Sequence, residues 1–300
     1  MSAINSVALA GATGNVGPAI LEHLLKAGFK VTVLTRQGTT HTFPESVTVK
    51  QVDYDSVDSL TSALEGQDAL VSTLGFVALS KQQNILEAAI KAHVKRFLPS
   101  EFGCDTEHPK NAKLPVFADK VVFQKAIAKE AANGRISYTY IVTGPFFDWG
   151  LTVGRLFLDP KEKKITLYDG GERQVSTTTL EDIGKAVAGV LKKPDETKNR
   201  SVFVQSTALS LKQLKIIAEK ITGTKWSTEE LSIEKDVLPA ALAELKKENP
   251  DLAKALLPQL MTSIYGEGYG SHFQKLDNEL LGLKQLSEAE VEAVVAAALK

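Results

Sequence analysis

The sequence has little of what several protein classes require. It contains a single cysteine, Cys104, which excludes an internal disulfide framework and suits a reducing compartment. The formal net charge is −1, so neither nucleic acid nor an anionic membrane is an expected partner. No apolar run approaches the ~18 residues that a membrane span needs, and the start of the chain lacks the cationic region of a signal peptide. We therefore expect a soluble, cytoplasmic protein.

Motifs for metal or nucleophile chemistry are missing as well. The five histidines are scattered and lack the spacing of metal ligands. Cys104 has no neighbouring lysine or histidine motif, and no Gly-x-Ser-x-Gly elbow occurs in the chain. We expect no metal site, and a nucleophilic role for Cys104 is not favoured.

The first half of the chain alternates short apolar runs with helical patterns. Hydrophobic residues make up 43% of the 300 residues and charged residues 24%, as in a globular protein with a substantial core. Strands are expected at residues 7–10, 31–34, 47–52, 69–74, 96–98 and 138–142. Helices are expected at residues 16–27, 56–66, 81–92 and 119–132. This order predicts an α/β fold, a Rossmann domain with a doubly wound parallel sheet.

The regular alternation of predicted strands and helices ends after Gly144 and Pro145. Short strands at residues 164–168 and 201–205 mix with helices at residues 180–191, 211–221 and 239–247. No Pro/Gly/Ser-rich linker separates the two halves. We expect a Rossmann domain at residues 1–155 and a smaller C-terminal α+β substrate-binding domain at residues 156–300. Segments near residues 175–206 are expected to return to the first domain.

A glycine-rich loop follows the first predicted strand and opens the first predicted helix. Gly11, Gly14 and Gly17 have the spacing Gly-x-x-Gly-x-x-Gly, which lets the chain turn sharply and approach a pyrophosphate closely. The helix N-terminus then offers N–H groups and a positive dipole end to the phosphates. We expect dinucleotide contacts from the loop residues Gly11, Thr13, Gly14, Asn15, Val16 and Gly17.

The end of the second strand distinguishes the two nicotinamide dinucleotides. NAD sites usually place an acid there to bind the ribose 2′-hydroxyl, whereas this chain has Arg36. A guanidinium can bind a 2′-phosphate with two parallel hydrogen bonds, and the hydroxyl groups of Thr39 and Thr40 can add donors. The alternative is a solvated surface arginine. The pattern favours NADP(H).

From Val7 to Phe147 the sequence resembles the NmrA-like family, and within it the isoflavone reductase-like group of atypical short-chain dehydrogenases/reductases. Three segments carry the resemblance: the glycine loop, residues 94–103 with the string Arg-Phe-Leu-Pro-Ser-Glu-Phe-Gly, and residues 117–120 followed by Tyr138-Thr-Tyr. The C-terminal half matches only in outline. The segment at residues 264–270 has no convincing counterpart in the plant reductases.

The resemblance implies a role for Lys120, which aligns with the lysine that these reductases place beside the nicotinamide. The Tyr-x-x-x-Lys pair of ordinary short-chain dehydrogenases is missing, because Val116 stands four residues before Lys120. A partly buried ammonium beside a hydride acceptor can polarise or protonate a substrate. The alternative is a solvated lysine on the helix surface.

Further contacts with the cofactor or the substrate are expected where the strands end, because such sheets bind ligands at that edge. Gln83 aligns with a glutamine that is frequent in the family, although helix-surface polarity explains it equally well. Phe146 can equally be a core aromatic, and Glu101 is expected to be mainly structural. The strand-end residues expected to contact the cofactor are Thr73, Leu74, Gly75, Pro99, Ser100, Gly144, Pro145 and Phe146.

Two functions of different classes follow. The first is an NADPH-dependent reductase of a small aromatic or phenolic molecule, with Lys120 as general acid/base. The second is a redox-sensing regulator that binds NADP(H) and acts through a protein partner, a role in which NmrA-like proteins lack the lysine. Lys120 and the segment ending at Gly103 favour the enzyme. The substrate is not identified, and the protein is expected to be a monomer or a homodimer.

Overall fold

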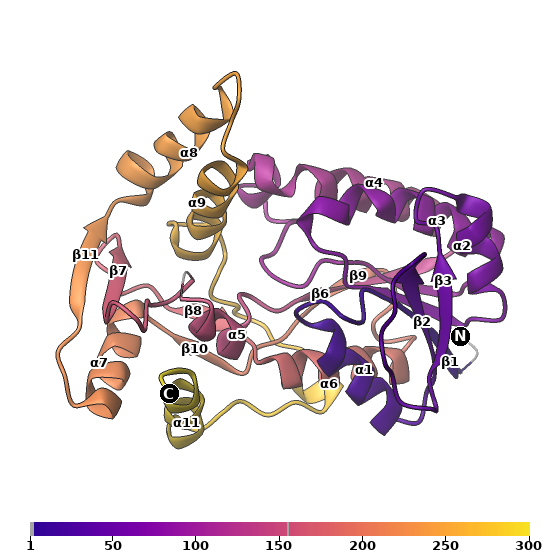
Figure 1. Ribbon diagram of the computed structural model, residues 1–300, viewed down its shortest axis with the longest axis horizontal. Coiled ribbons are helices and arrows are strands. Elements are labelled where there is room, and N and C mark those ends of the chain that lie inside the picture. The colour runs from indigo at the N-terminus through magenta and orange to yellow at the C-terminus, as the bar shows by residue number, and fades with distance from the viewer. Residues whose placement is uncertain (1–2, 155) are drawn as a thin grey trace.

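The computed structural model describes residues 3–154 and 156–300, so the predicted domain boundary at residue 155 lies outside the described residues. A parallel sheet of seven strands forms its centre, in the order β3-β2-β1-β4-β5-β6-β9 (Figure 1). The strands are β1 (Ser6–Ala10), β2 (Lys30–Arg36), β3 (Thr48–Val52), β4 (Ala69–Ser72), β5 (Arg96–Leu98), β6 (Ser137–Val142) and β9 (Arg200–Phe203). The predicted doubly wound sheet is confirmed.

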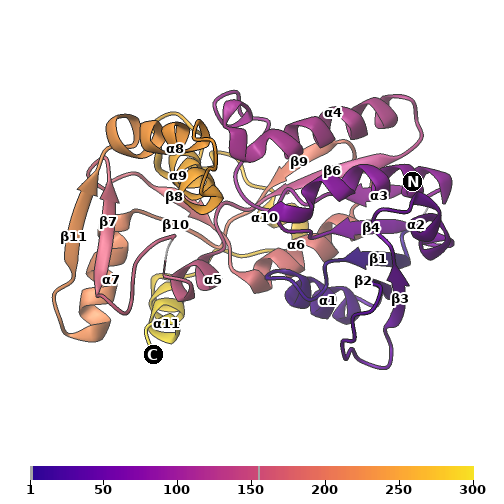
Figure 2. The ribbon, with the colours of Figure 1, turned by 45° about the horizontal axis from the view of Figure 1, so that its top comes forward.

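Helices cover both faces of this sheet (Figure 2). One face packs against α1 (Gly17–Lys26) and α6 (Leu180–Lys192), and the other against α2 (Val57–Leu64), α3 (Gln82–Lys91) and α4 (Ala118–Ala132). All four residues of the central strand β4 are buried, because both of its faces are covered. Because helices cover both faces, a ligand would bind at the edge formed by the carboxyl ends of the strands.

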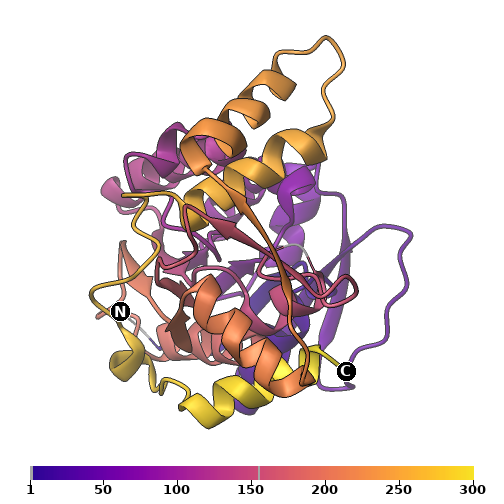
Figure 3. The ribbon, with the colours of Figure 1, turned by 90° about the vertical axis from the view of Figure 1, so that its left-hand side faces the viewer.

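A second region lies beside the sheet, at the left of Figure 1, and has its own apolar core. Figure 3 views it end-on, with the orange α8 and α9 at the top. Its helices are α5 (Phe147–Thr152), α7 (Leu211–Thr222), α8 (Leu238–Leu245), α9 (Leu252–Tyr265) and α11 (Glu288–Ala298). Its strands form two pairs, antiparallel β8 (Val175–Thr177) with β10 (Thr207–Leu209) and parallel β7 (Lys164–Tyr168) with β11 (Ser227–Leu231). No helix of the described residues is long and apolar enough to cross a membrane.

The chain returns from this second region to the main sheet. Strand β9 pairs with β6, and the short helix α10 (Asn278–Leu281) packs against α6. The carboxylate of Asp277, just before α10, accepts hydrogen bonds from the Phe203 backbone and the Arg200 guanidinium. Residues from the last third of the chain therefore complete the outer edge of the sheet.

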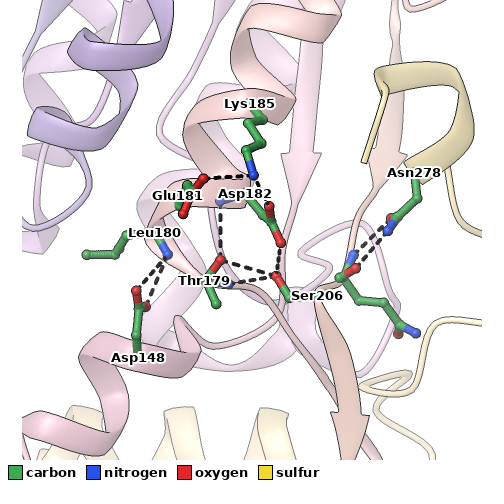
Figure 4. A network of polar contacts seen from close by, with 9 residues as sticks. Asp148, Thr179, Leu180, Glu181, Asp182, Lys185, Ser206 and Asn278 are labelled. Carbon is green, nitrogen blue, oxygen red and sulfur yellow. Dashed lines mark hydrogen bonds and ion pairs between the residues drawn. The ribbon is translucent and has the colours of Figure 1, made fainter. Parts of the chain in front are cut away.

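A buried polar network joins α5 to the start of α6 (Figure 4). The Asp148 carboxylate accepts the Leu180 N–H at 3.1 Å, and Thr179 caps α6 by accepting the Asp182 N–H at 3.2 Å. The Ser206 hydroxyl donates to the Asp182 carboxylate and accepts the Thr179 N–H. These bonds satisfy N–H groups that a helix start leaves without partners. They hold α5 at a fixed place beside the sheet edge.

Asp68 ties together the beginnings of β1 and β4. Its carboxylate accepts the N–H groups of Asn5 and Ser6 and the Lys95 ammonium at 2.7 Å. Burial favours the neutral acid, but the Lys95 and backbone donors outweigh burial, and the pKa of Asp68 is far below its usual value. The stabilisation is therefore fully present above the pKa of the unfolded chain, about 4, and is lost as the pH falls below it.

Substitution of Asp68 by asparagine is expected to lower the free energy of unfolding by about 2 kcal/mol at pH 7. The difference from the parent protein should shrink steadily between about pH 5 and pH 2. Urea unfolding at a series of pH values measures both quantities. Glu65→Gln, at an exposed carboxylate nearby, is the matched control and should change neither. An equal loss at pH 3 and pH 7 would contradict the assigned role.

Candidate functional site

Two cavities, each of about 570 Å³, lie end to end along the edge where the strands finish. They share the lining residues Gly14, Thr73, Leu74 and Gly75, so together they form one continuous cleft. We call the cavity that contains Arg36 the outer cavity and the one that contains Lys120 the inner cavity. A cleft at the carboxyl ends of the strands is where doubly wound sheets bind their ligands.

The glycine loop forms the floor between the two cavities. Gly11 has a φ of +86°, which a side chain disfavours, and a Cβ on Gly17 would lie 2.2 Å from the Gly11 carbonyl oxygen. The Thr73 hydroxyl lies 2.9 Å from the carbonyl oxygens of Ala10 and Gly11 and donates to them. Glycine is thus required here for a tight turn and a close approach of α1 to the loop. A pyrophosphate can lie against this backbone.

The outer cavity has a positively charged end. The Arg36 guanidinium makes no hydrogen bond or ion pair within the described residues, so it is available to a ligand. The Thr39 hydroxyl donates to the Arg36 carbonyl at 2.6 Å and holds the turn behind it. His41 lines the same cavity, and the Lys81 ammonium pairs with Asp55 across it. The sequence analysis did not assign His41, which lies two residues after Thr39 in the same loop.

The inner cavity contains Lys120, the third residue of α4. Its side chain is 7% exposed, and its Nζ lies 3.9 Å from Oε2 of Glu101, which is 1% exposed. Nζ makes no hydrogen bond to any residue that the structure describes. Burial raises the pKa of Glu101, while the Lys120 charge and the Thr106 hydroxyl oppose this effect. The sequence analysis missed that Glu101 lies beside Lys120.

The segment after β5 is held from both sides. The Ser100 hydroxyl donates to the Leu74 carbonyl at 2.8 Å, and the Ser100 N–H donates to Oε1 of Gln82 at 2.8 Å. The Gly103 carbonyl accepts the N–H groups of Thr143 and Gly144 at 3.0 and 2.9 Å. The ends of β4, β5 and β6 are thereby fixed relative to one another. This fixes the position of Glu101 next to α4.

The inner cavity is otherwise mostly apolar. Lys120 is its only charged lining residue in the described part of the chain. Its aromatic lining residues are Phe76, Phe102, Phe117, Phe146 and Trp149. Its other large apolar lining residues include Leu74, Leu79, Leu156, Leu257, Leu260 and Ile264. The last three lie on α9, and Trp149 lies on α5, which the network of Figure 4 anchors.

Residues 4–246 match the model of the NmrA-like family. The chain belongs to this family. The predicted family is thereby confirmed, over a longer stretch than the resemblance at residues 7–147.

The NmrA-like chain is also similar to individual proteins along most of its length. It is 31% identical over 297 residues to an oxidoreductase named poxI from Penicillium oxalicum, covering 95% of this chain and 92% of the relative. It is 28% identical to isoflavone reductase homolog P3 from Arabidopsis thaliana, covering 78% of each chain. A solved structure, AtPrR2 with NADP+ and (+)pinoresinol, superposes with a TM-score of 0.78 over 99% of this chain and 100% of that one, at 24% identity. That structural likeness shows the shared fold.

Most of the predicted contact residues of this NmrA-like protein line the cleft. Those that do are Gly11, Thr13, Gly14, Asn15, Val16, Arg36, Thr39, Thr73, Leu74, Gly75, Ser100, Lys120, Gly144, Pro145 and Phe146. Four others, Gly17, Thr40, Gln83 and Pro99, line neither cavity. Gly17 lies behind the loop, and the contact with Ser100 is made by Gln82, one residue before Gln83.

Proposed function

We propose that this chain is a reductase that transfers hydride from NADPH to a small, neutral aromatic or phenolic molecule, with Lys120 as the general acid/base. One observation carries the proposal. A buried ammonium without a hydrogen bond in the described structure lies in a mostly apolar cavity that adjoins the outer cavity lined by the glycine loop and Arg36. The Lys120 ammonium has an ion-pair partner in Glu101 but donates no hydrogen bond, so its N–H groups are available to a ligand.

The chain is an NADP(H)-dependent oxidoreductase. Its fungal relative is named an oxidoreductase, and a matched structure holds NADP+. Its own residues fit the cofactor, because the glycine loop leaves room for a pyrophosphate and Arg36 is free to bind a 2′-phosphate. NADPH, when bound, supplies the hydride.

The lining of the inner cavity supports a neutral substrate. Aromatic side chains such as Phe102 and Trp149 offer flat apolar surfaces, and Lys120 alone offers a charge in the described lining. A carboxylate substrate would find no second cation in the described lining. We expect the free energy of hydration that it loses to exceed the free energy of its interaction with Lys120. Lys120 Nζ would donate a proton to the substrate atom that gains negative charge as hydride arrives.

We also propose that the two parts of the chain have different roles in binding. Residues 1–155 would hold NADP(H), and residues 156–300 would close one side of the substrate cavity. The supporting observation is that α9 closes the inner cavity with Leu257, Leu260 and Ile264. The outer cavity is lined entirely by residues before β5.

The direct test is a substrate screen with the purified protein. NADPH oxidation is followed with phenylpropanoids, isoflavones, quinones and enones, beside measurements of NADPH and NADP+ affinity. We expect consumption of NADPH with at least one of these classes. Binding of NADPH without any turnover across the panel, together with a protein partner whose affinity depends on the cofactor's redox state, would instead establish the sensing regulator.

A further inference from the structure

Lys120 and Glu101 form a buried pair of opposite charges behind the inner cavity. Their side chains are 7% and 1% exposed, and Nζ lies 3.9 Å from Oε2. Oε2 also accepts the Thr106 hydroxyl at 2.6 Å, whereas Oε1 has no hydrogen-bond partner among the described residues. Removal of either charge alone would leave the other charge buried without a compensating partner.

The end of β5 and the helix α4 determine where Glu101 lies. The hydrogen bonds of Ser100 to Leu74 and Gln82 fix the end of β5. Helix α4 contributes both Lys120 and Gln124, and the Gln124 amide donates to the Thr106 hydroxyl. The other titratable groups that act on the pair are Cys104 and Glu107 in the loop after β5 and Tyr140 on β6. Burial raises the pKa of Cys104, Tyr140 and Glu101, and Glu101 is the carboxyl group that lies within ion-pair distance of Lys120.

We propose that Glu101 is a positioning residue that keeps the Lys120 side chain charged inside a mostly apolar cavity. The inference rests on the proposed function, because it assigns the origin of the proton that Lys120 would deliver. An ammonium in an apolar cavity favours its neutral form, and a carboxylate within about 4–6 Å favours the charged form. During turnover Nζ would give one proton to the substrate and become a neutral amine. Solvent would then return one proton to Nζ, and Glu101 would remain a carboxylate throughout.

The charge of Lys120 can be measured without a substrate. Trace acetic anhydride labels only neutral amines, and mass spectrometry of peptides gives the rate for each lysine as a function of pH. In Glu101→Gln we expect the labelling curve of Lys120 to move by at least one unit toward lower pH, or about tenfold faster labelling at pH 8. Lys125, exposed on the same helix, should label alike in both proteins.

Asp119→Asn is the matched control, since it removes an exposed carboxylate next to Lys120 in the chain and should leave the curve in place. Thr106→Val is a second variant for the case that Glu101→Gln does not fold. It removes a donor to Oε2, so it should move the curve in the same direction by a smaller amount. An unchanged curve in folded Glu101→Gln, or in Thr106→Val when only that variant folds, overturns the proposal. A shifted curve in a protein that reduces no substrate would support the role of Glu101 and reject the reductase.

Discussion

Replacement of Lys120 by methionine is expected to lower kcat for NADPH-dependent reduction by about 10²- to 10⁴-fold. Methionine keeps much of the length of the side chain but cannot hold a proton, and no other charged residue lines the inner cavity in the part of the chain described. The affinity for NADPH should change far less than kcat. Steady-state kinetics with a substrate found in the screen, beside a fluorescence titration of NADPH, separates the two effects.

Lys125→Met is the matched control for this variant. Lys125 is on the same helix and exposed, so its replacement should leave kcat unchanged. Lys120→Met also leaves Glu101 buried alone, and the double variant with Glu101→Gln should recover part of any lost stability. Full activity in a folded Lys120→Met protein would remove Lys120 from the mechanism.

Replacement of Arg36 by leucine is expected to weaken NADPH binding by about 10- to 100-fold and to leave NADH binding nearly unchanged. The physical reason is the loss of charge-assisted hydrogen bonds to the 2′-phosphate, worth about 1.5–3 kcal/mol. The two nucleotides differ only in that phosphate, so the ratio of their dissociation constants isolates the role of Arg36. Fluorescence titrations of both nucleotides give this ratio.

Salt provides an internal check on the Arg36 prediction. The preference of the parent protein for NADPH over NADH should decline as ionic strength rises, because Arg36 is exposed and its attraction is screened. Arg135→Leu, at a surface arginine paired with Glu130, should leave the preference intact. Equal losses for NADPH and NADH in Arg36→Leu would mean that Arg36 supports the loop rather than the phosphate.

The nucleotide half of the cleft could be predicted because its signals are local. Gly11 and Gly17 are needed for a turn and a close approach that involve neighbours in sequence, and the parallel strands bring their carboxyl ends to one edge. Residues at the ends of β1, β2 and β4, such as Gly11, Arg36 and Thr73, therefore meet at the outer cavity whatever their side chains. Topology alone places them together.

The substrate half was less predictable, because its wall comes from elements distant in sequence. Pro258 stands inside α9, and a proline predicts a helix end at that place, so the segment that carries Leu257 and Leu260 was not predicted as a helix. Gln82 rather than Gln83 contacts Ser100, because a shift of one residue on a helix turns the side chain about 100°. One missed helix did leave a signal: Ser287 and Glu290 form a capping box at the start of α11.

Because β9 comes late in the chain, the central sheet can be completed only late in synthesis on the ribosome. Until the chain has been made past Phe203, the outer edge of β6 has no partner, and the α10 segment that packs against α6 arrives later still. At roughly 5–20 residues per second, this edge stays open for several seconds after its synthesis. An unpaired strand edge is a template for wrong association. The nascent protein is therefore most exposed to aggregation in that interval, and a chain released before β9 would keep the edge of β6 unpaired.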